Sequence, residues 1–187
     1  NWVQSESFDI KGNLIASSKG YFDDLGKSTQ TQTLDIKEQR IWVTQTLYDA
    51  QGRPALNTLS APNSPKNLPS ASGIGFNYDI SFLRKGTGYR TPISTSDLET
   101  GDIENPPIVA NDVNTLGWYY SANNTDETYQ DITDRPYSRT IYSKLNPGAV
   151  LKTIGGNKID TNNDGVGDIW KQGYSFSMPA AQEMYYV

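Results

Sequence analysis

TLYDAQGRP, residues 46–54, is the stretch of sequence that decides the fold. In it the aromatic Tyr48 is followed by Asp49, and after two variable residues come Gly52 and Arg53. An aspartate side chain can bond to the backbone of a tight turn, and glycine supplies the positive φ that re-aims the chain. We therefore predict a β-hairpin in which Arg53 begins the return strand.

The hairpin motif is repeated. Two earlier copies share the aromatic residue, the aspartate and the glycine, namely Phe8, Asp9 and Gly12, then Phe22, Asp23 and Gly26. The segments beside these turns alternate as strands do. Within 40–48, we expect Ile41, Val43 and Leu47 to form the buried face, and Trp42, Thr44, Thr46 and Tyr48 to form the other. The charged run 35–39 predicts an exposed loop, inserted before the third hairpin.

Composition supports sheets throughout, because aromatic residues reach 11% of the chain and include 12 Tyr. We expect further strands at 76–83, 137–142, 149–154, 174–178 and 183–187. Residues 86–117 predict a long surface excursion with at most a minor helix near 96–98. The predicted fold class is all-β, with antiparallel hairpins that form a curved sheet or part of a β-shell and with long irregular loops. We divide the chain into hairpins at 1–60, a Pro/Ser-rich connector at 61–73 and a β-rich region at 74–187.

The charge of the chain limits its partners. A formal net charge of -5 lacks the basic footprint of a nucleic-acid binder. No apolar run reaches the roughly 20 residues that span a bilayer, so we expect no membrane span. The first residue is Asn1 and not Met. We therefore expect a processed product or a part of something longer.

The absence of two residue types narrows the chemistry. The chain has no Cys and no His, so it lacks thiolate nucleophiles, disulfides and the commonest general base. Nothing in the sequence pairs two carboxylates for glycoside hydrolysis, and no serine stands in a nucleophile elbow. We predict that the chain is not an enzyme.

An acidic loop at 160–168, DTNNDGVGD, carries the clearest chemistry in the sequence. Oxygen ligands recur at positions one, three, five, seven and nine, with glycine at position six, and calcium prefers such a shell of hard oxygen ligands. The predicted ligands are the side chains of Asp160, Asn162, Asp164 and Asp168 and the carbonyl of Val166. The alternative is an Asn/Asp/Gly-rich turn without metal.

The loop departs from an EF-hand at position twelve, where Lys171 replaces the bidentate glutamate. It therefore resembles the helix-free calcium loops of thrombospondin type 3 repeats. Glu183 is a candidate remote ligand on the ground of its charge. We predict calcium as the cofactor, with a role in stability more than in sensing.

The aromatic run Trp118, Tyr119 and Tyr120 permits two interpretations. It could form a stacking platform for a carbohydrate. Alternatively, the three residues belong to the core of a sheet, which is the favoured interpretation because a contiguous run must point to both sheet faces.

The three aromatic-Asp-x-x-Gly motifs, of which residues 46–54 are the best copy, resemble the YD repeats of Rhs-type bacterial proteins. The resemblance is specific over about the first 60 residues, and the turn at 146–148 is a weaker match. It implies a long β-strip that coils into a shell around a C-terminal toxin or other cargo, or that stands on the bacterial surface as an adhesin. It also implies a secreted or cell-surface location.

Two classes of function follow. In the first, the chain is a structural segment whose partners are the remainder of a longer polypeptide or another protein chain. In the second, it is a self-contained surface module that recognises a glycan or a protein partner.

Overall fold

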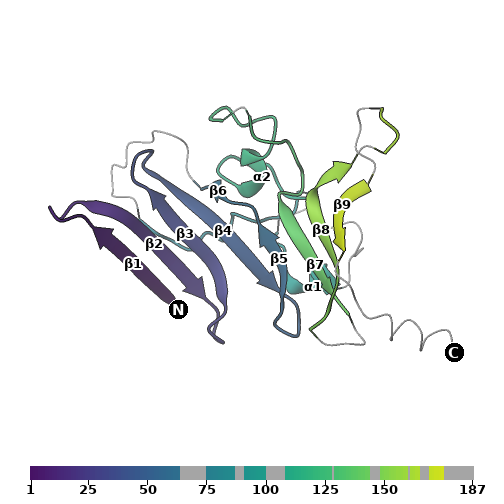
Figure 1. The fold of residues 1–187 in the computed structure, drawn as a ribbon, viewed down its shortest axis with the longest axis horizontal. Helices are drawn as coiled ribbons and strands as arrows, with labels where there is room; N and C mark the ends of the chain where they lie inside the picture. The colour runs from purple at the N-terminus through teal and green to yellow at the C-terminus, as the bar shows by residue number, and fades with distance from the viewer. Residues whose placement is uncertain are drawn as a thin grey trace.

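A computed structural model describes residues 1–63, 75–86, 91–99, 108–127, 129–143, 148–159, 161–164 and 169–174. Their strands form one antiparallel sheet of nine strands, confirming the all-β prediction. The strand order is β1-β2-β3-β4-β5-β7-β8-β9. The short β6 is outside this order and pairs with β4. Figure 1 shows the sheet spread from β1 at one end to β9 at the other.

The first five strands follow one another along the chain and along the sheet. They are β1 (Trp2–Phe8), β2 (Leu14–Phe22), β3 (Ser28–Asp35), β4 (Arg40–Tyr48) and β5 (Pro54–Thr58). The remaining elements are β6 (Ala61–Pro62), α1 (Thr95–Glu99), α2 (Leu116–Tyr119), β7 (Tyr137–Tyr142), β8 (Val150–Ile159) and β9 (Ile169–Tyr174). Within the described residues, neither helix has the length or the apolar character that crossing a membrane requires.

The sheet has one covered face, and its register explains which residues lie there. Directly paired residues point to the same side of a sheet, so Leu47, Leu56, Arg139 and Ile154 share one face through the pairing of β4, β5, β7 and β8. Leu56, Arg139 and Ile154 are buried. On β4, Ile41 and Val43 are buried and Leu47 packs partly against the core, as predicted.

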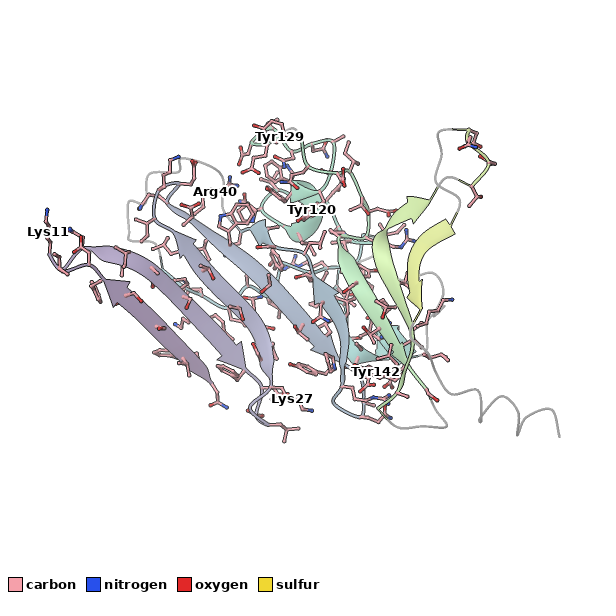
Figure 2. The ribbon with its side chains drawn as sticks, viewed as in Figure 1. Lys11, Lys27, Arg40, Tyr120, Tyr129 and Tyr142 are labelled. Atoms are coloured by element: carbon pink, nitrogen blue, oxygen red, sulfur yellow. The ribbon has the colours of Figure 1, made fainter. Side chains whose placement is uncertain are left out.

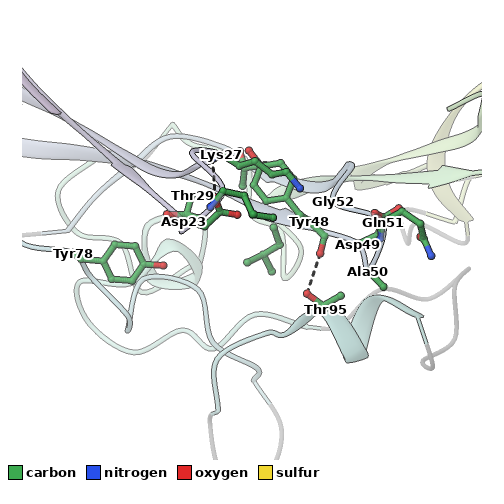
Figure 3. Close-up of a pocket in the computed structure, with 13 residues that line it drawn as sticks. Asp23, Lys27, Thr29, Tyr48, Asp49, Ala50, Gln51, Gly52, Tyr78 and Thr95 are labelled. Atoms are coloured by element: carbon green, nitrogen blue, oxygen red, sulfur yellow. Dashed lines mark hydrogen bonds between the residues drawn. The ribbon is translucent and has the colours of Figure 1, made fainter. Parts of the chain in front are cut away.

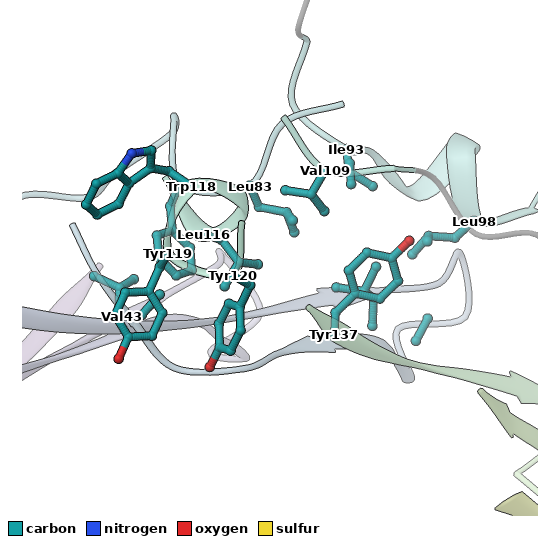
Figure 4. Packing of buried hydrophobic residues seen from close by; sticks show 14 of the residues in the cluster. Val43, Leu83, Ile93, Leu98, Val109, Leu116, Trp118, Tyr119, Tyr120 and Tyr137 are labelled. Atoms are coloured by element: carbon teal, nitrogen blue, oxygen red, sulfur yellow. The ribbon is translucent and has the colours of Figure 1, made fainter. Parts of the chain in front are cut away.

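The covered face is closed by irregular chain and two short helices. Figure 4 shows Leu83, Val109 and Leu116 above the strands, with Val43 and Tyr137 among the residues packed below them. The described parts of the excursion predicted over the sheet at 86–117 do cover the sheet, but Leu98, Val109 and Leu116 are buried there, so these parts also contribute to the core. The minor helix expected near 96–98 is α1.

The predicted strand at 76–83 does not form. Instead, this segment crosses the covered face, and two buried glutamines of β3 hold its backbone. The Gln30 amide pairs with both backbone groups of Asp79, at 3.0 Å and 2.9 Å. Gln32 donates to the carbonyl of Asn77 at 2.6 Å. We call residues 75–79 the strap; its backbone hydrogen-bonds to glutamine side chains and not to a neighbouring strand.

Two other boundaries differ from the predicted ones. The connector predicted at 61–73 begins as part of the sheet, because Ala61 and Pro62 pair with Val43 and Trp42. The pairing of β5 with β7 makes the regions 1–60 and 74–187 share one sheet.

The strand predicted at 137–142 is confirmed as β7, and that at 149–154 lies within the longer β8, apart from its first residue. The predicted strand at 183–187, and 174–178 beyond Tyr174, lie outside the described residues.

Candidate functional site

The three motif copies form the same hairpin turn. In each, one aspartate oxygen accepts the backbone N–H groups two and four residues later; in the third copy these are Gln51 and Arg53, at 3.0 Å and 2.8 Å. Each glycine donates to the carbonyl of its aspartate and has a positive φ between 74° and 82°. This is a type I turn closed by a glycine bulge, the three-residue hairpin loop.

The third turn adds an ion pair. The second carboxylate oxygen of Asp49 accepts Nε of Arg53 at 2.7 Å and lies 2.6 Å from its Nη2. Burial alone would raise the pKa of Asp49, but the hydrogen bonds and positive charge of Arg53 outweigh it and hold that pKa below its ordinary value. In the first turn, the side chain of Asn13 lowers the pKa of Asp9. Asp9 and Asp49 therefore serve as charged acceptors.

A cleft of about 430 Å³ opens between the second and third turns. Figure 3 shows Asp23 and Lys27 near the centre, Asp49 to Gly52 to their right, Tyr78 at the left and Thr95 below Tyr48. The second and third turns contribute Asp23, Lys27, Tyr48 and Asp49, the strap contributes Tyr78 and α1 contributes Thr95. Thr95 fixes α1 to the rim by donating to the carbonyl of Tyr48 at 3.0 Å.

Lys27 and Gly52 are fitted to each other across this cleft. The Lys27 ammonium lies 5.4 Å from the centre of the Tyr48 ring. A methyl group on Gly52 would come within 1.8 Å of Lys27 Nζ. Gly52 thus has two roles, because it supplies the positive φ of the turn and leaves room for the ammonium.

Two tyrosines give the cleft aromatic walls. Tyr48 donates its hydroxyl to the carbonyl of Ser28 at 2.8 Å, and burial, with the charge of Asp23, raises its pKa. Tyr78 keeps 45% of its surface exposed and meets Tyr21 edge to face, with ring centres 5.4 Å apart. An ammonium, carboxylates and aromatic rings around one cleft can bind a small polar molecule.

Only part of this cleft can be predicted from the sequence. The motif residues of the second and third turns were predicted as turn formers. Tyr78 and Thr95 come from distant segments that carry no motif, and Lys27 directly follows the glycine of the second motif copy. Their meeting depends on the strap and α1, which no local pattern predicts.

The predicted calcium loop lies mostly outside the described residues, including Asp160, Val166 and Asp168. The described part, 161–164, is exposed. There Asn162 accepts the backbone N–H of Asp164 at 3.0 Å, and Asn163 has a φ of 60°. Among the residues that the structure describes, no three acidic side chains gather into a metal-binding group.

The aromatic run at 118–120 belongs to the core. Thr115 caps α2 by accepting the N–H of Trp118 at 3.3 Å, so the run begins in a helical turn and not in a strand. All three aromatic residues are buried, with Tyr119 only 1% exposed. The platform interpretation is therefore wrong, because stacking needs an accessible ring face. Burial first, and then Glu127, raises the pKa of Tyr119.

An ion cluster around the buried Arg40 holds the loop after α2 on the sheet. Arg40, the first residue of β4, lies 3.0 Å from Asp126 and 3.9 Å from Glu127. Glu127 also accepts the hydroxyl of Tyr119. Figure 2 shows Arg40 at the end of β4 that lies toward α2. This cluster positions the core aromatics.

Comparison of the chain with family models, with curated proteins and with solved structures finds no match.

Proposed function

We propose that this chain is a non-enzymatic structural segment of a longer, secreted or surface-exposed bacterial polypeptide of the YD-repeat kind, within a β-strip that encloses a toxin or other cargo. The observation that carries the proposal is the same turn geometry three times in the first five strands. A turn with a fixed shape and a variable middle lets hairpin follow hairpin. Such a sheet grows by addition of units at its edge.

Adding one unit tests this modular growth. A copy of residues 14–27, which holds β2 and the second turn, is placed before Asn1. We expect the new strand to pair with β1, so that the amides of Trp2, Gln4 and Glu6 exchange more slowly with solvent and the melting temperature rises. An added unit that stays protease-sensitive, with β1 exchanging at its original rate, would contradict the proposal.

We propose calcium as the ligand of the 160–168 loop. The proposal rests on the alternating oxygen spacing and on three carboxylates, Asp160, Asp164 and Asp168, that would repel one another without a cation. Calorimetric titration with CaCl₂ should give a one-site binding curve for the parent chain and none for Asp164→Ala. Identical heats for the two proteins would exclude the site.

The cleft between the turns supports the second candidate function, a module that binds a glycan. Tyr78 offers an exposed ring for stacking, and Lys27 and Asp23 offer charged groups for sugar hydroxyls. Titration with cellobiose, followed by amide chemical shifts, should perturb the signals of the two turns. Lys27→Ala should weaken this response, whereas Lys11→Ala, in the first turn, should leave it unchanged. Equal responses from the two variants would refute the assignment.

A further inference from the structure

No strand among the described residues pairs with the outer edge of β1. All seven residues of β1 are exposed, and Trp2, Val3 and Phe8 each keep more than half of their surface accessible. β1 stands first in the strand order, so the described residues provide a partner, β2, on one side only. Exposed strand edges pair readily unless lysine, proline or a strong bulge protects them. β1 contains neither lysine nor proline, and its one irregularity lies between Ser7 and Phe8.

The hydrogen bonds at the two ends of β1 show which backbone groups face outward. Phe22 donates to the carbonyl of Asn1 at 3.0 Å, and Asp9 donates to the carbonyl of Asn13 at 2.9 Å. Hydrogen-bonded positions alternate along an antiparallel strand. The odd-numbered residues from Asn1 to Asp9 therefore bond toward β2. The even-numbered residues turn their N–H and C=O groups to the open side.

The residue types at these even-numbered positions are nearly symmetric about the middle of the strand. They are aromatic, amide, carboxylate and aromatic in order, Trp2, Gln4, Glu6 and Phe8. A second copy running antiparallel, with the two-fold axis at Ser5, places Trp2 opposite Phe8 and Gln4 opposite Glu6. Aromatic residues directly opposite each other stabilise neighbouring strands. The Gln4 amide can donate to a Glu6 carboxylate, as it does within one copy at 2.8 Å.

Neighbouring registers fit less well. A shift by two residues in one direction sets Glu6 opposite Glu6 of the second copy, and like charges directly opposite are unfavourable. The shift in the other direction sets Trp2 opposite Glu6 and leaves Phe8 without an aromatic partner. Of these three registers, the one with its two-fold axis at Ser5 pairs both the outward backbone groups and the side chains favourably.

We propose that two copies of this chain associate through β1 in this register and form one continuous sheet across the two-fold axis. The inference concerns the 187-residue chain itself and goes beyond the structural role proposed above. In a longer polypeptide, a preceding hairpin would compete for the same edge. Because a single seven-residue strand buries little surface, the dimer is expected to be weak and dependent on concentration.

Disulfide trapping tests the register directly, because the chain has no cysteine of its own. Ser5 meets Ser5 of the second copy at a non-hydrogen-bonded position, where Cα atoms lie about 4.5 Å apart, within the range of a disulfide. Ser5→Cys should therefore give a covalent dimer on mild oxidation. Ser7→Cys is the matched control: its partner is Val3, and it should remain monomeric on a non-reducing gel.

Opposite charges at Gln4 test the pairing in solution. In the symmetric dimer, Gln4→Lys places the lysine of each copy opposite Glu6 of the other copy. We therefore expect dimerisation about fivefold tighter in sedimentation experiments. Gln4→Glu should weaken it about fivefold. Within one copy the two substitutions have the opposite effects on stability, because Gln4 also faces Lys19 on β2, where a lysine at position 4 meets a like charge. Gln4→Lys should thus lower the melting temperature of the monomer, which separates hairpin stability from association.

Three results would overturn the proposal. The first is a parent chain that stays monomeric at every accessible concentration. The second is equal cross-linking of Ser5→Cys and Ser7→Cys, which would indicate random collision. The third is a dimer whose affinity is the same with lysine and with glutamate at position 4, since that dimer would use another surface.

Discussion

Alanine in place of Gly52 is expected to destabilise the chain more than alanine at the matching glycines of the other two turns. Gly12, Gly26 and Gly52 have φ values of 82°, 77° and 74°, so a side chain at each costs about 1 kcal/mol in the left-handed region. A methyl group at Gly12 or Gly26 would meet nothing within 4 Å. At Gly52 it would collide with the Lys27 ammonium.

The size of the extra loss follows from that collision. The end of a lysine side chain is flexible, so Lys27 moves away and gives up its position over the Tyr48 ring, a contact of 5.4 Å. Such a cation–π interaction contributes about 0.5–1 kcal/mol. Gly52→Ala should therefore reduce the free energy of unfolding by about 1.5–2 kcal/mol, against about 1 kcal/mol for Gly12→Ala or Gly26→Ala.

Urea unfolding measures these differences as shifts of the midpoint at constant slope. A double-mutant cycle with Lys27→Ala isolates the contact: without the lysine, Gly52→Ala should cost no more than Gly12→Ala. Equal losses of unfolding free energy for the three glycine-to-alanine variants would contradict this prediction. So would an extra loss at Gly52 that persists in the Lys27→Ala background.

Three further predictions concern polar groups. Because the pKa of Asp49 is lowered in the folded chain, its contribution to the free energy of unfolding is fully present above the unfolded pKa, near 3.8, and is lost as pH falls through the folded pKa. Asp49→Asn should therefore flatten the acid side of a plot of unfolding free energy against pH. Arg40→Met should cost about 2–3 kcal/mol in urea unfolding, because it removes a buried guanidinium from Asp126, and Asp126→Asn should cost less. Gln30→Leu leaves both backbone groups of Asp79 without their glutamine partner and should cost about 1–3 kcal/mol; an Asp79 amide that exchanges at the parent rate would contradict this.

The hairpins could be predicted from the sequence because their cause is local. An aspartate, a glycine three positions later and an aromatic before them specify the turn, and the alternation beside it specifies the faces. The burial of Ile41 and Val43 follows from the same alternation. These features need no knowledge of the rest of the chain.

The covering layer could not be predicted in this way. The strap at 75–79 alternates like a strand, but its hydrogen bonds go to the side chains of Gln30 and Gln32. Polar glutamines rarely signal a buried face, so the sequence gives no warning of this contact. Trp118 lies in a helical turn that Thr115 caps.

The candidate cleft divides in the same manner. Asp23, Asp49 and Gly52 were identified from the motif, whereas Tyr78 and Thr95 reach the cleft only through tertiary packing. The acidic loop differs from the cleft, because its ligand spacing is local in the sequence whereas most of its residues lie outside the described part of the chain. Its spacing carries a chemical prediction that calcium titration can test directly.

The glutamine strap also bears on how the chain folds. Hairpins between adjacent strands close over short loops and form rapidly, whereas the Gln30–Asp79 contact joins residues 49 positions apart and the Arg139–Ala55 contact joins residues 84 apart. Loop closure over such distances is slower. The early species is therefore expected to be a meander whose two polar glutamines still face water. Hydration of these two amides keeps the uncovered part of β3 soluble until the strap buries it, whereas Ile41 and Val43 on the neighbouring β4 stay exposed until the covering layer packs on them.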